Sequence, residues 1–398
     1  MPPKLIAVVS CAALMMAVAV PSLSASASPK AKLSTIKLMA ISTVGSPAAS
    51  YPEVFSSAKA AAAAINKAGG VHGHKLKIIT CNDNFDPNAA TQCGRTAVHD
   101  RVTAVVGAVS TFISNILPVL QANKIPSIGS ANASAAEVTD NNSFTITGGT
   151  GLYGNAGATE LINHGKNKIA IVYIDIPIVA PLLASIEKTI PTLGNKTGTV
   201  VATIPVSPTA TDMSTYTAAL KASGASGALF VLSSGQVDEL LQSDYEAGLS
   251  TSTVTPALNT LAPADLASLG AAANGCYTTD SFYPSSDLSI PGIKKFNIDM
   301  DSFGSQDPRT DYALEAWASV YAAAKVMAKA KVYTSGALLK ALPKAGPISL
   351  GVLPPFNWGK PIASLSPERI FSDNMVFSII TNGKIVPQGG FTNVLGLN

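Results

Sequence analysis

The chain has 398 residues, of which 13% are charged and 6% aromatic, and its formal net charge is +3. A charge this close to neutral, without a basic stripe, excludes nucleic acid as an expected partner, and so few aromatic residues offer few platforms for base stacking. The length exceeds what one ordinary hydrophobic core holds, so we expect two domains.

The N-terminus has the pattern of a secretory signal peptide. Lys4 precedes an uncharged apolar run at residues 5–20, and Ala-Ser-Ala at residues 25–27 forms a small-x-small cleavage site. We therefore predict a signal peptide over residues 1–27 and export to the periplasm or the extracellular face of the cell. Cys11 stands in a loose lipoprotein-like box, but the apolar stretch before it is too short, so we expect no lipid anchor there.

Strand-like apolar runs alternate with helix-like segments along most of the chain. The expected strands are residues 36–43, 75–81, 103–109, 125–130, 168–175, 199–204, 227–233 and 275–281. Helices are expected at residues 52–68, 87–99, 114–122 and 309–330, among others. Near-continuous apolar strands with intervening helices predict parallel sheets that are covered on both faces. The last segment differs, because Asn382-Gly383 lies between two alternating strands within residues 371–389 and predicts a β-hairpin.

Three cysteines follow the expected leader. Cys81 ends an apolar strand and Cys93 lies on the next helix, so a local disulfide is geometrically reasonable in an exported protein. Such a bridge would stabilise the fold by about 3 kcal/mol in the chain-entropy model. Cys276 is then left over, and we expect a buried thiol that packs as a small apolar side chain.

Residues 149–154, which begin with Gly149 and end with Gly154, match the pattern GxGxxG. The pattern follows a short strand and opens a helix, and Asp175 ends the next strand. In a dinucleotide enzyme, such glycines admit a pyrophosphate at the helix N-terminus and the acid binds a ribose hydroxyl. A secreted NAD-type oxidoreductase is therefore one alternative function, although nicotinamide cofactors are scarce outside the cell.

Other catalytic or metal chemistry has little support in the sequence. His72 and His74 flank one glycine but lack a third ligand at a useful spacing, so we expect a polar turn there. No GxSxG nucleophile elbow occurs. We expect no metal, no cofactor, no catalytic residues and no enzyme activity.

The region around the first two strands resembles a known family. The matching motifs are Tyr51, Ile65-Asn66, Gly69-Gly70 and Asp86-Pro87-Asn88-Ala89. Further similarity extends through residues 105–134 and, more loosely, through residues 168–175, 312–328 and 356–358. In this order, the motifs resemble the branched-chain amino-acid-binding family of ABC-transporter solute-binding proteins over nearly the whole mature chain.

The resemblance implies a type I periplasmic-binding-protein fold, an α/β architecture with two doubly wound, mostly parallel-sheet lobes joined by three crossover segments. Lobe one would hold residues 34–148 and 283–349, and lobe two residues 149–282 and 350–398. A ligand would lie between the lobes, at the carboxyl ends of their strands. The lobes would close on it and present the closed form to an ABC permease in the membrane. We expect a monomer.

The resemblance also implies a set of ligand contacts in lobe one. Family members hold a ligand carboxylate with hydroxyl and amide groups after the third and fourth strands. The matching residues here are Ser110, Thr111, Phe112, Ser130, Ala131, Asn132 and Ala133. Helix N-termini are electropositive and suit an anion. Thr111 and Asn132 are the main expected contacts, and the alternative is that they only cap helices.

Lobe two departs from the family pattern. Members that bind amino acids hold the ammonium group with an acid after the strand near residues 253–258, whereas Asn259 is the polar residue there. Ser233 is the polar candidate in the preceding loop. A buried ammonium would lack its partner, so a plain α-amino acid is not the expected ligand unless Asp175 or Asp280 substitutes.

The expected ligand is a small polar or carboxylate-bearing molecule with an apolar part. Tyr51, Phe112 and Tyr153 are the aromatic residues expected to grip that part. A ligand-sensing module that serves a receptor instead of a permease is a further alternative, which the sequence does not separate from transport.

Overall fold

The computed structural model describes residues 1–3, 33–46, 49–131, 134–192, 198–249, 253–256, 261, 263–363 and 369–394. Residues Ser34–Asn398 form one compact unit. Beyond residue 3, the predicted signal peptide lies outside the described residues, as does Cys11. In the described part of the chain, no helix is long and apolar enough to cross a bilayer.

The first sheet has five parallel strands in the order β2–β1–β3–β4–β5. They are β1 (Ile36–Ser42), β2 (Leu76–Asn82), β3 (Ala104–Ala108), β4 (Ser127–Ser130) and β5 (Ser143–Phe144). The helices between and after them are α1 (Glu53–Lys67), α2 (Pro87–His99), α3 (Ile113–Ala122) and α4 (Ala135–Thr139). The strands and helices predicted for this part of the chain are confirmed.

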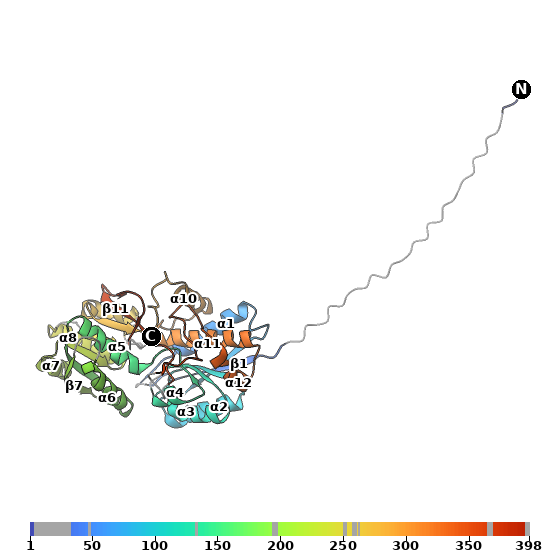
Figure 1. The fold of residues 1–398 in the computed structure, drawn as a ribbon. Coiled ribbons are helices and arrows are strands. Elements are labelled where there is room, and N and C mark those ends of the chain that lie inside the picture. The colour runs from blue at the N-terminus through green and yellow to red at the C-terminus, as the bar shows by residue number, and fades with distance from the viewer. Residues whose placement is uncertain are drawn as a thin grey trace. The chain divides into compact units, whose positions relative to one another are not determined.

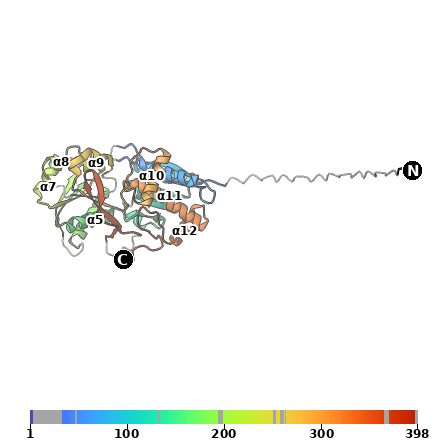
Figure 2. The ribbon, with the colours of Figure 1, turned by 90° about the horizontal axis from the view of Figure 1, so that it is seen from above.

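Side chains of β1 explain why helices cover both faces of this sheet. Leu38 and Ala40 pack in one core with α1 and with α11 (Asp311–Ala330). Met39 and Ile41 pack in another core with α2 and α3, because successive residues of a strand point to opposite faces. Figures 1 and 2 show α1 and α11 side by side although they are far apart in the sequence.

The second sheet has the order β12–β11–β10–β9–β8–β6–β7, and β13 pairs with β11. Its strands are β6 (Lys168–Ile174), β7 (Thr199–Val206), β8 (Gly227–Val231), β9 (Thr253–Pro256), β10 (Tyr277–Asp280), β11 (Asn374–Thr381), β12 (Lys384–Pro387) and β13 (Thr392–Asn393). Its helices are α5 (Thr150–Asn163), α6 (Ala180–Thr189), α7 (Ser214–Ala222), α8 (Ser234–Glu246) and α9 (Pro263–Leu269). Strands β6 to β10 are parallel, and β11 and β12 form the predicted antiparallel hairpin. Asn382 and Gly383 have φ of 51° and 70° in its turn, which is the left-handed backbone that an Asn-Gly turn supplies.

The chain passes between the two sheets three times. It crosses first from β5 through α5 to β6, and then from β10 through α10 (Pro291–Phe303) to α11, which packs on β3 and β4. The third passage leads from α11 and α12 (Ser335–Ala341) to β11. The two-lobed α/β fold predicted from the sequence is thereby confirmed.

The predicted lobe boundaries stay a prediction. Val352, Phe356 and Trp358 are buried in the core of the first sheet, and Trp358 Nε1 donates a hydrogen bond to the carbonyl oxygen of Thr145 at 2.7 Å. These side chains follow residue 350, where the second lobe was expected to resume, and they precede β11. The third crossover therefore contributes side chains to the first core before it reaches the second sheet.

Candidate functional site

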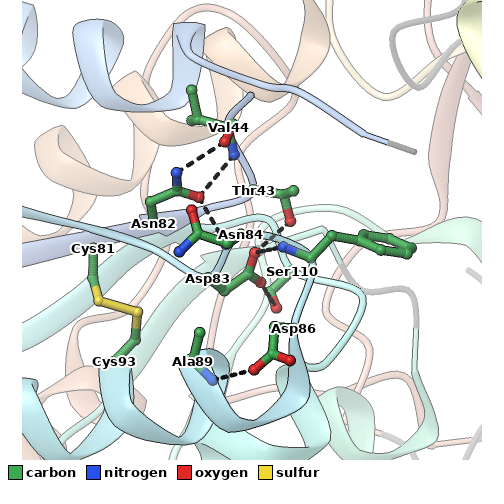
Figure 3. The surroundings of a disulfide bond; sticks show 11 residues. Thr43, Val44, Cys81, Asn82, Asp83, Asn84, Asp86, Ala89, Cys93 and Ser110 are labelled. Atoms are coloured by element: carbon green, nitrogen blue, oxygen red, sulfur yellow. Dashed lines mark hydrogen bonds between the residues drawn. A yellow bond between two sulfur atoms is a disulfide. The ribbon is translucent and has the colours of Figure 1, made fainter. Parts of the chain in front are cut away.

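A buried carboxylate ties together the loops that follow β1, β2 and β3 (Figure 3). Asp83 comes directly after β2 and has 0% exposure. Thr43 Oγ1 donates to Asp83 Oδ1 at 2.6 Å, and the hydroxyl of Ser110 donates to Asp83 Oδ2. Parallel strands end at the same edge of a sheet, which is why one acid reaches both neighbouring loops. The sequence analysis missed Asp83, although an acid directly after an apolar strand was the available signal.

Two further interactions hold this edge of the sheet, namely the hydrogen bonds of Asn82 and a disulfide. Asn82 accepts from the amide of Val44 and donates to its carbonyl oxygen, both at 2.9 Å. The disulfide between Cys81 and Cys93, with Cα atoms 5.7 Å apart, joins the end of β2 to α2. The predicted disulfide is confirmed. Cys276 is buried as expected, and burial raises the pKa of its thiol to about 12, so the reactive thiolate is suppressed.

The predicted contacts after β3 differ in whether their hydrogen-bonding groups already have partners in the protein. The Ser110 hydroxyl donates to Asp83 and accepts from the amide of Phe112 at 3.1 Å. Thr111 is half-buried and, among the described residues, forms no hydrogen bond. The ring of Phe112 lies edge-on to that of Phe85, with centroids 5.5 Å apart. The structure therefore makes Ser110 a support for the loop, whereas the donors of Thr111 have no partner within the described ranges.

The residues after β4 are described only in part. Ser130 and Ala131 are buried, and the amide of Ala131 donates to the carbonyl oxygen of Ala108 at 3.0 Å. That amide, expected to face a ligand, is thus used in pairing with β3. Asn132 and Ala133 lie outside the described residues.

The candidates near the second sheet are dispersed. Asp175 is exposed at the end of β6, and its amide donates to Val206 at 2.9 Å. Ser233 precedes α8, and its hydroxyl donates to Gln236 Oε1 at 3.2 Å. Within the described residues, neither side chain shares a hydrogen bond, ion pair or ring contact with a candidate near the first sheet. Asn259 lies outside the described residues.

The two candidate tyrosines lie near the N-terminus of α11. The ring of Tyr51 is edge-on to that of Tyr312, with centroids 5.0 Å apart. Burial, and then the charge of Glu53, raise the pKa of Tyr51 to about 12. Tyr153 has 1% exposure and packs against Ala156 and Met375, so its ring belongs to a small core instead of an open surface.

Four carboxyl groups, Glu53, Asp280, Asp311 and Glu315, are also buried around the start of α11. We call them the buried carboxyl cluster. Burial raises the pKa of Glu53 and of Asp280 to about 7 in each case. Burial, with the charges of Asp280 and Glu315 adding, raises the pKa of Asp311 well above its usual range. The sequence did not indicate this cluster, because its members come from three distant segments.

The GxGxxG segment lacks the structural context of a dinucleotide site. Its glycines open α5, but β5 before the helix belongs to the first sheet and β6 after it belongs to the second. A dinucleotide-binding βαβ unit needs both strands in one sheet. Gly154 has a packing reason instead, since a Cβ there would lie 2.4 Å from Cδ1 of Ile186 on α6.

The two histidines form a polar turn. His72 Nδ1 lies 2.9 Å from the hydroxyl of Tyr333, and His74 Nδ1 lies 2.8 Å from the carbonyl oxygen of Ser34. The described residues contain no group of three His, Cys, Asp or Glu side chains that could hold a metal ion.

Comparison with known proteins identifies the class. The family of periplasmic binding proteins matches residues 35–364, so the chain belongs to that family. Its members and the structural neighbours are solute-binding proteins and not enzymes, as the sequence predicts. No curated protein matches the chain.

Solved structures share the fold at low sequence identity. A branched-chain amino acid ABC transporter protein from Thermus thermophilus, with bound valine, has a TM-score of 0.79 and 16% identity, covering 91% of this chain and 97% of its own. The fatty acid ABC transporter substrate-binding protein from Thermomonospora curvata has a TM-score of 0.76 and 17% identity, covering 90% and 92%. A solute binding protein from R. palustris in complex with benzoate has a TM-score of 0.73 and 17% identity, covering 90% and 96%.

Proposed function

We propose that the chain is the extracellular solute-binding protein of an ABC importer and captures a small carboxylate-bearing or otherwise polar ligand at the loops after β1, β3 and β4. Family membership supports the class. The related folds bind valine or benzoate or serve fatty acid transport, and all three kinds of molecule carry a carboxyl group.

The state of the β3–α3 loop carries this proposal. The Ser110 hydroxyl donates a hydrogen bond to Asp83 and accepts one from the amide of Phe112. These bonds fix the loop before a ligand binds. Thr111, the next residue, keeps its hydroxyl and amide unused among the described residues. A fixed loop with unused donors at the start of α3 suits an anion, because the helix N-terminus adds partial positive charge.

The proposal also includes export of the chain, closure of the two lobes and transfer of the ligand to a permease. The predicted leader would carry the chain out of the cytoplasm, where binding would draw the two lobes together about their three crossovers. A membrane permease would then receive the ligand from the closed form, and the binding protein itself makes and breaks no bond.

The ligand we propose lacks an α-ammonium group. Residues 255–259 carry no acid, and Asp175 is exposed. Asp280, the other acid that could substitute, lines a different groove together with residues 284–287 and 309–311. An ammonium enclosed between the lobes without a carboxylate partner would cost several kcal/mol. A carboxylate with an apolar tail avoids that cost.

A thermal-shift screen with paired acids tests this proposal. The pairs are leucine with 4-methylpentanoate, valine with 3-methylbutanoate, and phenylglycine with phenylacetate. We expect the acid without the ammonium group to raise the melting temperature more in at least one pair. Strong stabilisation by leucine or valine, with none by any other acid, would reject the proposed ligand class.

A pair of threonine variants then tests the site itself. Thr111→Val removes the unused hydroxyl and keeps the shape, so affinity for the best acid should fall about tenfold, as for a lost hydrogen bond to a charged group. Thr215→Val, on the exposed face of α7, should bind normally. Equal affinities in isothermal titration would place the ligand elsewhere.

A further inference from the structure

A groove with a volume of about 510 Å³ lies apart from the strand-end loops. Its polar side is formed by Thr278 and Asp280 of β10, by residues 284–287, and by residues 309–311 at the start of α11. Its apolar side is formed by Leu261, Leu266 and residues of β12. None of the residues of the proposed ligand site lines it. A cavity of this size is within the range of small-molecule sites.

Two buried carboxyl groups face this groove. Asp280 has 6% exposure and Asp311 has 9% exposure. Asp280 Oδ2 accepts a hydrogen bond from the Thr278 hydroxyl at 3.1 Å, whereas Asp311 Oδ2 is buried and has no hydrogen-bond partner in the described part of the chain. The two groups are close enough for the charge of Asp280 to raise the pKa of Asp311.

The basic residues at the groove do not neutralise these acids. The Arg309 guanidinium donates to the carbonyl oxygens of Asp307 and Ser305 and forms an ion pair with Asp301 at 2.8 Å. Lys384 is exposed at the rim on β12. Among the described residues, no ion pair links either of them to Asp280 or Asp311. A buried charge without a partner is costly, so the pair must hold protons or a cation.

We propose that the groove binds an organic cation, whose ammonium group lies between Asp280 and Asp311 while its apolar part packs on Leu261, Leu266 and Ile385. A divalent metal ion fits less well, because hard cations take six or more oxygen ligands and the described residues contain no cluster of three metal-binding side chains. The apolar wall of the groove favours an alkyl or aryl amine.

Such a cation would bridge the two lobes. Asp280 ends β10 of the second sheet, and Asp311 begins α11, which packs on the first sheet. A ligand held by both carboxylates therefore contacts both ends of the second crossover. The lobes move relative to each other about this crossover when they close. This second ligand would act on closure, separately from the carboxylate solute.

Isothermal titration of the wild-type protein with n-pentylammonium chloride, 1-pentanol and sodium pentanoate tests the proposal. The three probes share one chain and differ in charge. We expect pentylammonium to bind at least about tenfold more tightly than pentanol, because only the cation pairs with the buried carboxylates. Equal binding of the cation and the alcohol, or no binding of the cation, would overturn the proposal.

Three variants locate the site. Asp280→Asn and Asp311→Asn should each weaken pentylammonium binding about tenfold or more, and Asp212→Asn, which changes an exposed acid before α7, should leave it unchanged. Unchanged binding in the first two variants would overturn the site. If circular dichroism shows that a variant does not fold, the comparison of the three probes on the wild-type protein still tests the proposal. In variants that do fold, normal binding of the carboxylate ligand shows that the groove and the proposed solute site fail independently.

Discussion

Asp83 shows how one side chain positions a binding loop. It accepts hydrogen bonds from the buried hydroxyls of Thr43 and Ser110 and from the partly buried amide of Phe85. The arrangement is fixed before ligand binding, which reduces the ordering cost of capture.

Removal of the Asp83 carboxylate should lower the stability of the fold. Asp83→Ala leaves two buried hydroxyls and one partly buried amide without this acceptor, and we expect the free energy of unfolding in urea to fall by about 3 kcal/mol. Asp301→Ala removes an exposed carboxylate that pairs with Arg309 and should cost less than about 1 kcal/mol. Similar losses in both variants would contradict the role assigned to Asp83.

The buried carboxyl cluster predicts a particular dependence of stability on pH. The folded pKa of Asp280 is raised from 3.8 to about 7, and that of Glu53 from 4.5 to about 7. Between these values the folded chain holds more protons than the unfolded chain, so stability falls as pH rises. We expect the melting temperature to decrease from pH 5 to pH 7.5, and Asp280→Asn to flatten that decrease. A variant with the wild-type slope would show that Asp280 does not titrate in this window.

Individual functional residues were only partly predictable. Cys81 and Cys93 could be paired from the sequence because they are local. Thr111 was indicated only by the family resemblance, and its contact with a ligand stays a prediction. Asp280 and Asp311 could not be brought together from the sequence, because their proximity depends on how the second crossover folds back onto the first sheet.

At the scale of elements, α5 shows a glycine pattern used for packing. A Cβ on Gly154 would lie 2.4 Å from both Cδ1 and Cγ1 of Ile186. Gly154→Ala should therefore lower the free energy of unfolding by about 1–3 kcal/mol, as overpacking does. Gly235→Ala on α8 has open space around it and should be neutral or stabilising by up to about 1 kcal/mol. A stable Gly154→Ala protein, or one whose loss is confined to NADH binding, would contradict the packing role.

The disulfide makes a second prediction at this scale. Reduction of the Cys81–Cys93 bridge, which closes a loop with a sequence separation of 12, should destabilise the protein by about 3 kcal/mol. Melting curves with and without dithiothreitol measure this loss. Cys276→Ala should keep the sensitivity to reductant, and Cys81→Ala/Cys93→Ala should abolish it. Sensitivity that persists in the double variant would exclude the bridge as its source.

Most elements could be predicted because their patterns are local. The Asn382-Gly383 hairpin and the apolar face of α11 are examples. The course of the third crossover could not be predicted, since Phe356 and Trp358 carry no strand or helix period, and only their packing with the first core shows where they belong.

At the scale of the whole molecule, the protein consists of two sheets that three passages of the chain connect. The loops after β1 and β3 are tied to one buried acid, and the described residues show unused donors at Thr111. The second crossover brings Asp280 and Asp311 from the two sheets to one groove. Ligand capture and control of closure would thus act through different parts of the same fold.

Small-angle X-ray scattering with and without the acid that gives the largest thermal shift tests the central claim most directly. We expect a smaller radius of gyration with bound ligand in the wild-type protein, and the same change in Thr111→Val only at a higher concentration of the acid. Saturating binding with an unchanged radius of gyration would contradict a two-lobed protein that closes on its solute.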